Sequence, residues 1–445
     1  MTQPMTYILK NGRVVDPANG RDGIFDIEVR DGVIARIGVD LPVPEGTPIL
    51  DVPASCVVTP GLIDMHVHLR EPGQEHKETV ASGVAAAVAG GFTAVACMPN
   101  TSPINDSAAV TRYILDKAQE AGLARVYPIG AASVGSKGGQ MAEIGELKAA
   151  GCVAVSDDGH PISTALLMRR VLEYAGMLDV LVIDHCEDPS LKGEGVVHEG
   201  AVATELGLRG IPGQAEELWI ERDITLAGLT ATSFHVAHLS TAGSLRAVRA
   251  GKARGIAVTC EVAPHHFVLT DEALRGYDTN TKMNPPLRPQ ADVQALIEGL
   301  ADGSVDAIAT DHAPHHADEK ALSYDQAPFG ITGLETAVSL TFDRLLHAGH
   351  IDLTRLVELL SVNPARILKV VGGALHQGAP ADISVLAPDL PVTVRAATQK
   401  SLSKNMPFEG WTLRGGVAAT IVGGRLVYRN AAVDGLAAWP SAPVQ

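Results

Sequence analysis

A short segment, GLIDMHVHLREPG at residues 61–73, carries two histidines one residue apart and an arginine two residues later. If the segment is a strand, alternate side chains share a face, so His66 and His68 point the same way. Neutral imidazole is the commonest metal ligand in proteins, and such a pair can occupy adjacent positions on one ion. For an isolated pair, a polar strand face that meets solvent or is satisfied in a core is an equally good interpretation. The rest of the chain must decide between them.

Composition limits the class of protein. The 445 residues exceed the usual size of one core, which predicts a large barrel with an appendage, or two domains. Hydrophobic residues make up 46% and aromatic residues only 4%, as in a large soluble α/β protein packed from small aliphatic side chains. A formal charge of -16 argues against general affinity for nucleic acid or an anionic membrane, so an anionic small molecule would need a local positive site.

Cysteine use and the N-terminal sequence predict a cytoplasmic location. The five cysteines are scattered and lack Cys-x-x-Cys spacing, which predicts buried thiols in a reducing compartment. The first residues contain no basic segment followed by a long apolar one, so we expect no signal peptide. Residues 81–98 are uncharged over the length of a membrane span, but Gly90 and Gly91 divide them into an Ala-rich helix and a short strand.

Apolar, β-prone runs alternate with helical patterns through the middle of the chain. The runs are at 57–68, 92–100, 124–133, 152–159, 179–188, 232–240, 255–266 and 305–315. Helices are predicted at 79–89, 107–120, 165–174, 214–227, 243–253 and 291–301. Eight strand-helix units favour an α/β fold of the (β/α)8 TIM type, although a doubly wound sheet could also hold eight strands.

The polar residues favour the barrel, and the flanks predict a second domain. Nearly every apolar run ends in functional groups such as His-Val-His, Ser-Asp-Asp or Asp-His, and in a barrel these ends form one rim around one site. Short strands with frequent turns occupy both flanks of the chain and could pair into one small β-sandwich. The predicted domains are residues 1–55 with 375–445 for this sandwich, and 56–374 for the catalytic barrel.

Several motifs together resemble one family. They are PGLIDMHVHLREPG, MPNT, SDDG, DHCED, AHLST, KMNPPLR and ATDHAPH, in that order along the chain. This set is similar to the amidohydrolase superfamily, and within it to the bacterial-type dihydroorotases, from about Tyr7 to Val427. The resemblance implies a metal-dependent hydrolase barrel with a β-sandwich built from both termini.

The resemblance also implies a set of metal ligands. His66, His68 and Asp311 would hold a first ion, His185 and His238 a second, and Asp158 would bridge them. Nitrogen and carboxylate ligands suit one or two Zn²⁺ ions, with Mn²⁺ or Co²⁺ as substitutes. Many amidohydrolases bridge their metals with a carbamylated lysine on the fourth strand, but the segment GCVAVSDDG contains no lysine. Asp184 departs from the small residue expected in DHCED and could perturb the second ion's site.

The implied activity is the reversible, metal-dependent hydrolysis of dihydroorotate to carbamoyl aspartate in pyrimidine biosynthesis. Asp311 would take a proton from the attacking water and deliver it to the leaving nitrogen. A guanidinium can grip a carboxylate through two parallel hydrogen bonds, which suits Arg70 to the carboxylate of dihydroorotate. A surface ion pair with Glu71 is the alternative for Arg70 taken alone. The substrate-binding residues implied are His68, Arg70, Asn100, Asn284, His315, Phe329 and Gly330.

Other interpretations remain open at this point. The chain could be another cyclic amidohydrolase, similar to hydantoinases or allantoinases, but Arg70 and Asp158 argue against this alternative. A non-catalytic scaffold for aspartate transcarbamoylase would be signalled by lost metal ligands, yet all six are present. Residues 315–330 form a polar loop that could close over the rim, and His312 and His316 are expected to be exposed or packed in loops. The implied partners are a small-molecule substrate, a second copy of the chain in a homodimer, and aspartate transcarbamoylase.

Overall fold

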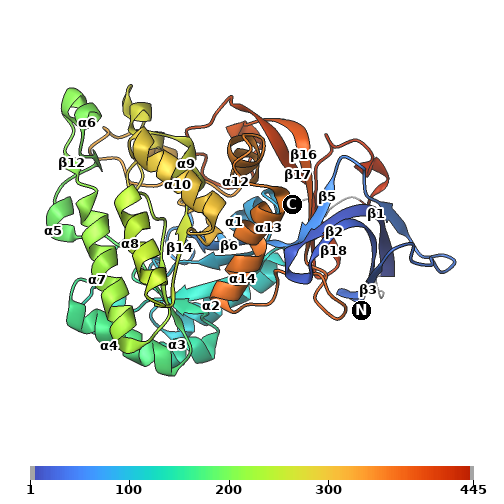
Figure 1. Cartoon of the computed structure of the whole chain (residues 1–445), viewed down its shortest axis with the longest axis horizontal. Helices are drawn as coiled ribbons and strands as arrows, with labels where there is room; N and C mark the ends of the chain where they lie inside the picture. Colours follow the sequence, from blue (N-terminus) through green and yellow to red (C-terminus); the bar gives the residue numbers. More distant parts are fainter. Residues whose placement is uncertain (1–5, 441–445) are drawn as a thin grey trace.

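The chain contains two large sheets that lie side by side. The computed structural model describes residues 6–440, so the outermost ends of the predicted terminal domain, 1–5 and 441–445, lie outside the described residues. One sheet forms a barrel surrounded by helices, and the other is formed by the first and last parts of the chain (Figure 1). The predicted fold class is therefore confirmed.

The barrel consists of eight parallel strands. They are β6 (Leu62–Val67), β7 (Phe92–Cys97), β8 (Arg125–Gly130), β9 (Ala154–Val155), β10 (Leu181–Asp184), β13 (Phe234–Val236), β14 (Val258–Val262) and β15 (Ala307–Ile308). Each lies within one of the eight apolar runs. The last strand returns to the first through a parallel bridge between Val67 and His312, where His68 N donates to His312 O at 2.8 Å. This closure excludes the doubly wound alternative.

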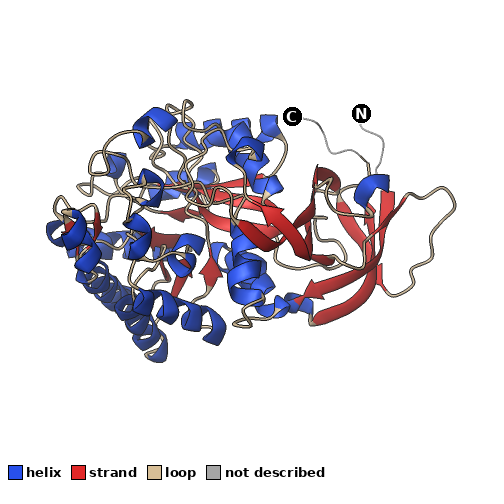
Figure 2. Cartoon of the chain, turned by 90° about the horizontal axis from the view of Figure 1, so that it is seen from above, coloured by secondary structure: helices blue, strands red, loops and turns tan. Residues whose placement is uncertain are grey.

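Helices surround the barrel, as seen from above in Figure 2. The longer ones are α1 (Val80–Ala89), α2 (Ala108–Ala121), α3 (Ile144–Ala150), α4 (Ala165–Met177), α7 (Gln214–Thr230), α8 (Ala242–Ala253) and α10 (Gln290–Asp302). The last barrel strand is followed along the chain by α12 (Ala337–Thr341), α13 (Leu353–Val357) and α14 (Asn363–Leu368). Shorter elements follow the carboxyl ends of β10, β14 and β15. They are α5 (Pro189–Lys192), β11 (Val197–His198), α6 (Ala201–Leu206), β12 (Gly210–Ile211), α9 (Pro264–Val268) and α11 (Ala317–Lys320).

Local sequence explains where α1 and β7 begin and end. Thr79 caps α1 by accepting a hydrogen bond from Ser82 N at 3.0 Å, and the helix ends at Gly90. Phe92 then opens β7, whose residues are all buried. The uncharged segment 81–98 is therefore a helix followed by a barrel strand, as predicted.

Two apolar clusters line the two faces of the barrel strands. The interior is filled by small and medium side chains from nearly every strand, among them Ile63, Ala94, Ile129, Ile183 and Ala307. The outer cluster lies between strands and helices. Small interior residues leave little room for aromatic rings, which agrees with the low aromatic content of the chain.

The terminal sheet also has eight strands. They are β1 (Thr6–Asp16), β2 (Arg21–Arg30), β3 (Val33–Gly38), β4 (Ile49–Asp51), β5 (Val57–Pro60), β16 (Ile383–Thr393), β17 (Thr412–Val422) and β18 (Arg425–Arg429). Strand β5 joins the two ends of the chain, because it pairs with β1 on one side and β16 on the other. The run at 57–68 thus divides at Gly61 between the two sheets. The domain boundaries set at 55/56 and 374/375 stay a prediction.

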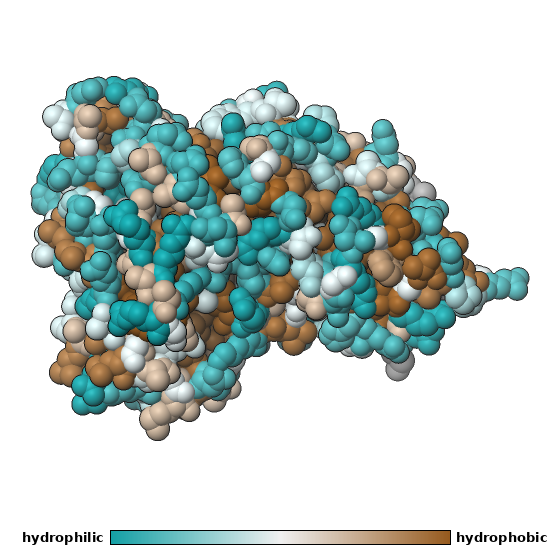
Figure 3. Space-filling model, in the orientation of Figure 1, coloured by the Kyte–Doolittle hydropathy of each residue, from teal (hydrophilic) through white to brown (hydrophobic). Residues whose placement is uncertain are grey.

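The surface is mixed in character. Hydrophilic residues cover much of the face in Figure 3, with hydrophobic residues in separate patches between them. Within residues 6–440, none of the helices has the length and apolar character needed to cross a membrane. The five cysteines are all free and buried, as predicted.

Candidate metal centre and substrate pocket

The carboxyl ends of five barrel strands bring the six predicted ligands together. His66 and His68 lie at the end of β6, and the others follow β9, β10, β13 and β15 in the form of Asp158, His185, His238 and Asp311. All six are buried. This is the end of a TIM-type barrel at which active sites occur.

The first group comprises His66, His68 and Asp311. Asp311 Oδ1 lies 3.1 Å from His68 Nε2 and 3.6 Å from His66 Nε2. Strict alternation along β6 fails, because the pairing with β7 shifts between Asp64 and Val67, yet both Nε2 atoms still face Asp311. The expected common orientation of the two imidazoles is therefore present.

Asp158 lies at the centre of the site. Its carboxylate is 3.4 Å from His66 Nε2 and 3.5 Å from His68 Nε2. It is also 3.6 Å from His238 Nε2 and 3.8 Å from His185 Nδ1. One carboxylate thus contacts all four imidazoles, which is the place that a bridging ligand requires.

The second group is less regular than the sequence suggested. His185 Nδ1 and His238 Nε2 face each other at 3.0 Å. The ligand atoms close enough for one ion are those of His66, Asp158 and His238, while His185 lies at their edge. The assignment of His185 and His238 to a second ion stays a prediction.

The donor atoms fit a metal ion. His66 Nε2 and Asp158 Oδ1 are buried and lack a hydrogen-bond partner within the described chain. Buried polar atoms are normally satisfied, so such atoms require an explanation. Imidazole nitrogens and carboxylate oxygens converging on one space are the ligands of Zn²⁺ and similar divalent ions.

The backbone at three of these strand ends is strained. Arg70, His238 and Asp311 have φ angles of 62°, 30° and 48°, in a region that residues other than glycine seldom adopt. Such conformations cost free energy and persist where the surroundings enforce them, often at active sites. At these positions the strand ends turn sharply around the central space.

The electrostatics of the site favour ionised carboxylates. Burial acts to raise the pKa of Asp311, but the hydrogen bond from His68 and the nearby histidines hold this pKa below its usual value. Asp158 behaves in the same way, with His66 as the main opposing influence on its pKa. Burial lowers the pKa of Arg70 to about 10, which still leaves the guanidinium charged at neutral pH.

A pocket of about 210 Å³ opens beside these residues. All seven residues predicted to bind substrate line it, namely His68, Arg70, Asn100, Asn284, His315, Phe329 and Gly330. The pocket is also lined by Gly159, Lys192 and Ala313, which were not predicted from the sequence. Lys192 is paired with Glu187 at 2.6 Å. Glu187 lies within the motif DHCED, but none of the quoted motifs includes Lys192.

Arg70 does not form the ion pair with Glu71 that was the alternative. Glu71 instead accepts hydrogen bonds from Val80 N at 2.8 Å and from the Tyr113 hydroxyl at 3.0 Å. The guanidinium of Arg70 is buried, donates to Pro314 O at 3.1 Å and lies 3.3 Å from His315 Nε2. Since neither contact neutralises its charge, Arg70 is a buried cation facing the pocket.

The two asparagines contact imidazoles of the ligand set as well as the pocket. Asn100 Oδ1 lies 2.8 Å from His68 Nδ1. Asn284 Nδ2 lies 3.0 Å from His185 Nε2 and donates to Glu187 Oε2 at 3.1 Å. These contacts orient the rings, a function that the sequence motifs did not reveal.

Asp184 points away from the predicted metal site. It lies on the outer side of β10, where it accepts a hydrogen bond from Trp219 Nε1 at 3.0 Å. Burial raises its pKa, and the neighbouring Asp223 raises it further. A carboxyl held between the barrel and α7 faces neither the pocket nor Asp158, so the suspected perturbation has no direct contact to act through.

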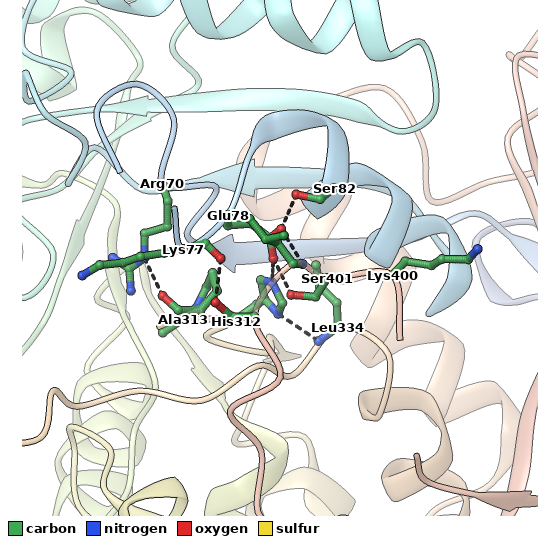
Figure 4. Close-up of polar contacts among 12 residues, drawn as sticks. Arg70, Lys77, Glu78, Ser82, His312, Ala313, Leu334, Lys400 and Ser401 are labelled. Carbon is green, nitrogen blue, oxygen red and sulfur yellow. Dashed lines mark hydrogen bonds and ion pairs between the residues drawn. The ribbon is translucent and has the colours of Figure 1, made fainter. Parts of the chain in front are cut away.

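His312 is buried. Its Nε2 lies 3.3 Å from Glu78 Oε2, and its Nδ1 accepts a hydrogen bond from Gly333 N at 3.1 Å. Figure 4 shows Glu78 between His312 and Ser401, so the carboxylate links the end of β15 to a late loop. His316 is nearly half exposed and caps α11. Exposure or packing within a loop was expected for these two histidines. His312 is packed inside the protein, and His316 is exposed.

The fold and the donor set together are those of an amidohydrolase, and comparison with solved structures agrees. An L-hydantoinase (dihydropyrimidinase) from Arthrobacter aurescens is similar over 96% of both chains, with a TM-score of 0.84 and 24% sequence identity. A D-hydantoinase (dihydropyrimidinase) from Thermus sp. covers 95% of both chains, with a TM-score of 0.78 and 26% identity.

Sequence relatives define the family more narrowly. The family model described as "Dihydro-orotase-like" matches residues 55–244. A dihydroorotase of Geobacter metallireducens is 54% identical over 96% of this chain and 100% of its own length. A dihydroorotase of Pelotomaculum thermopropionicum is 53% identical over 96% and 99%. The chain belongs to the dihydroorotase family of metal-dependent amidohydrolases.

Proposed function

We propose that the protein is a dihydroorotase, which interconverts dihydroorotate and carbamoyl aspartate in pyrimidine biosynthesis. One observation carries the proposal: a buried guanidinium without a carboxylate partner faces the same small pocket as the six ligand-type side chains. A cation in that position favours a substrate with a carboxylate next to the ring nitrogen. A relative that is named dihydroorotase and is 54% identical in sequence supports the same reaction.

The metal is proposed to be one or two Zn²⁺ ions, with Mn²⁺ or Co²⁺ as substitutes. His66, His68 and Asp311 would hold the first ion, His185 and His238 the second, and Asp158 would lie between them. When bound, such ions polarise a carbonyl group and lower the pKa of a water molecule to near neutrality. Two buried atoms, His66 Nε2 and Asp158 Oδ1, support this assignment because neither has a hydrogen-bond partner among residues 6–440.

Arg70 is proposed to bind the substrate carboxylate. Its Nε donates a hydrogen bond to Pro314 O, its Nη2 lies beside His315 Nε2, and both Arg70 and His315 line the pocket. Asn100, Asn284 and the backbone at Phe329 and Gly330 complete the walls that would orient the pyrimidine ring. Binding at these points holds the amide carbonyl toward the ligand cluster and limits the water that enters.

Asp311 is proposed to act as general base and then as general acid. Its carboxylate lies beside the proposed ligand His68 and lines the pocket, so it reaches both the proposed metal site and the substrate. In ring opening it takes a proton from the attacking water and delivers it to the departing nitrogen. In ring closure the same carboxyl group works in the opposite order.

Two other functions are less well supported. A hydantoinase-like activity shares the fold, but the buried Arg70 favours a substrate with a carboxylate. The aspartate in place of a bridging lysine resembles the dihydroorotases instead. A non-catalytic scaffold would not need the six ligand-type residues that this chain retains. We also propose a homodimer, a complex with aspartate transcarbamoylase, and a cytoplasmic location, the last supported by five free cysteines.

The test is a substrate comparison with purified, metal-loaded protein. Dihydroorotate, hydantoin and allantoin are offered separately, and ring opening is followed for each. We expect turnover of dihydroorotate, and loss of that turnover after treatment with a chelator. Turnover of hydantoin or allantoin in place of dihydroorotate would refute the proposed substrate.

A further inference from the structure

A buried glutamate lies directly behind one of the proposed ligands. Glu261, on β14, has an exposed fraction of 1%. Its Oε1 lies 2.7 Å from His66 Nδ1, and its Oε2 lies 3.3 Å from His235 Nε2. Neither Glu261 nor His235 lines the pocket that contains the proposed ligands.

Glu261 has no positively charged lysine or arginine partner in the described part of the chain. Its ion-pair distances are to the two imidazoles only. A buried carboxylate is costly unless it is hydrogen-bonded, and an ionised carboxylate can only accept hydrogen bonds. His66 must therefore carry a proton on Nδ1, and His235 must carry one on Nε2.

This protonation determines what the other side of the His66 ring can do. In a neutral imidazole with a proton on Nδ1, Nε2 carries a lone pair. His66 Nε2 is the buried atom without a hydrogen-bond partner, 3.4 Å from Asp158 Oδ1 and 3.6 Å from Asp311 Oδ1. The lone pair therefore faces the space where the ligand atoms converge.

We propose that Glu261 is a positioning residue for the metal centre: it holds the His66 ring and its tautomer so that Nε2 is free to bind the first ion. This inference rests on the proposed metal site. A carboxylate behind a ligating histidine also makes the ligand more basic. Glu261 thus acts through His66 and touches neither substrate nor metal.

Glu261 is itself held from the far side. His235 Nδ1 lies 2.7 Å from Thr259 Oγ1, so Thr259, His235, Glu261 and His66 form a continuous row of hydrogen bonds. His68 differs, because its Nδ1 faces the neutral amide oxygen of Asn100. The two histidines of the His-x-His motif thus have different supports, one charged and one neutral.

The experiment measures metal binding apart from turnover. Wild-type protein, Glu261→Leu and Glu261→Gln are freed of metal, and Zn²⁺ alone is titrated in competition with a chromophoric chelator. Substitution of a residue that hydrogen-bonds to a metal ligand typically costs roughly tenfold to a hundredfold in metal affinity. We expect a loss near the upper end for leucine, which removes the acceptor, and about tenfold for glutamine, which keeps a neutral one.

A second readout reports on the ring directly. In metal-free protein labelled with ¹⁵N histidine and kept at a pH high enough for the His66 ring to be neutral, the His66 signals should show the Nδ1-protonated tautomer in wild type and a mixture of tautomers in Glu261→Leu. A purely structural role for Glu261 would leave the tautomer unchanged. Glu28→Gln is the matched control, because Glu28 is buried to the same 1% in the terminal sheet and should leave Zn²⁺ affinity unchanged.

The outcomes separate this inference from the proposed function. If wild-type protein binds no Zn²⁺ at its site or does not open dihydroorotate, the proposed function fails. If wild type does both, but either folded Glu261 variant binds Zn²⁺ with wild-type affinity, the positioning role is wrong. Should Glu261→Leu not fold, Glu261→Gln decides by the same criterion.

Discussion

Buried carboxylates occur both in the terminal sheet and at the rim of the barrel, but they are satisfied differently. In the terminal sheet, Asp26 pairs with Lys10 at 2.8 Å, and Glu28 pairs with both Arg30 and Arg36. At the rim, Asp158 and Asp311 face imidazoles alone and form no lysine or arginine pair among residues 6–440. These carboxylates of the terminal sheet are thus neutralised by permanent cations, whereas Asp158 and Asp311 keep lone pairs available for an ion.

The difference has a physical reason. A carboxylate removed from water needs an opposite charge and hydrogen bonds to offset its desolvation. A permanent cation next to Asp158 would supply that charge and compete with a metal ion for the same oxygens. Arg70 is close to the site, yet its contacts are Pro314 O and His315. At Asp158 and Asp311 the absence of a lysine or arginine partner in the described chain therefore leaves carboxylate oxygens that an ion could bind.

The largest effect is expected from Asp311→Asn. The substitution keeps the shape but removes the basic oxygen, so kcat should fall by the ~10²–10⁴ typical of lost general acid-base catalysis. The measurement is dihydroorotate turnover after the metal content has been matched to wild type. Near-normal turnover in that sample would reduce Asp311 to a ligand.

Arg70→Met should have the next largest effect. It removes a charge-assisted contact worth roughly 1.5–3 kcal/mol, so kcat/KM for dihydroorotate should fall on the order of tenfold to a hundredfold. Metal content, measured on the same sample, should stay normal because Arg70 is not a proposed ligand. Unchanged kcat/KM would remove Arg70 from the substrate site.

Glu28→Gln should affect stability and leave the chemistry intact. Loss of the charge opposite Arg30 and Arg36 should lower the free energy of unfolding by about 1–3 kcal/mol, as measured by denaturant titration. Its kcat should match wild type, because Glu28 lies in the terminal sheet, away from the rim. A fall in kcat at normal metal content would show that the two regions are not independent.

The smallest effect is expected from bicarbonate. Asp158 occupies the central position between the imidazoles, and Lys192, the one lysine among the described residues that line the pocket, is already paired with Glu187. Added bicarbonate should therefore leave turnover unchanged. A carbamylated lysine detected by mass analysis of the intact site would contradict this.

Much of the rim was predictable because strand ends carry recognisable motifs. His66, His68 and Asp311 follow apolar runs, and parallel strands of a barrel bring such ends together. The division of the run 57–68 at Gly61 was not predictable, since β-prone residues occur on both sides of Gly61 and only pairing with β1 and β16 assigns β5 to the other sheet.

Side-chain partners distant in sequence were the other part that could not be predicted. Glu261 is separated from His66 by 195 residues, and no local pattern reveals their contact. Asp184 follows the apolar run as the ligands do, but it lies on the outer face of β10 beside Trp219. Sequence position gave the strand end in each case, and only packing determined the face.

The most direct test of the whole account is a metal titration of chelator-treated protein. Zn²⁺ is added in known amounts, and bound metal and dihydroorotate turnover are measured on the same samples. The account predicts that turnover is absent without metal and rises with bound metal until one or two ions per chain are held. Full turnover in metal-free protein, or saturation with metal and no turnover, would contradict it.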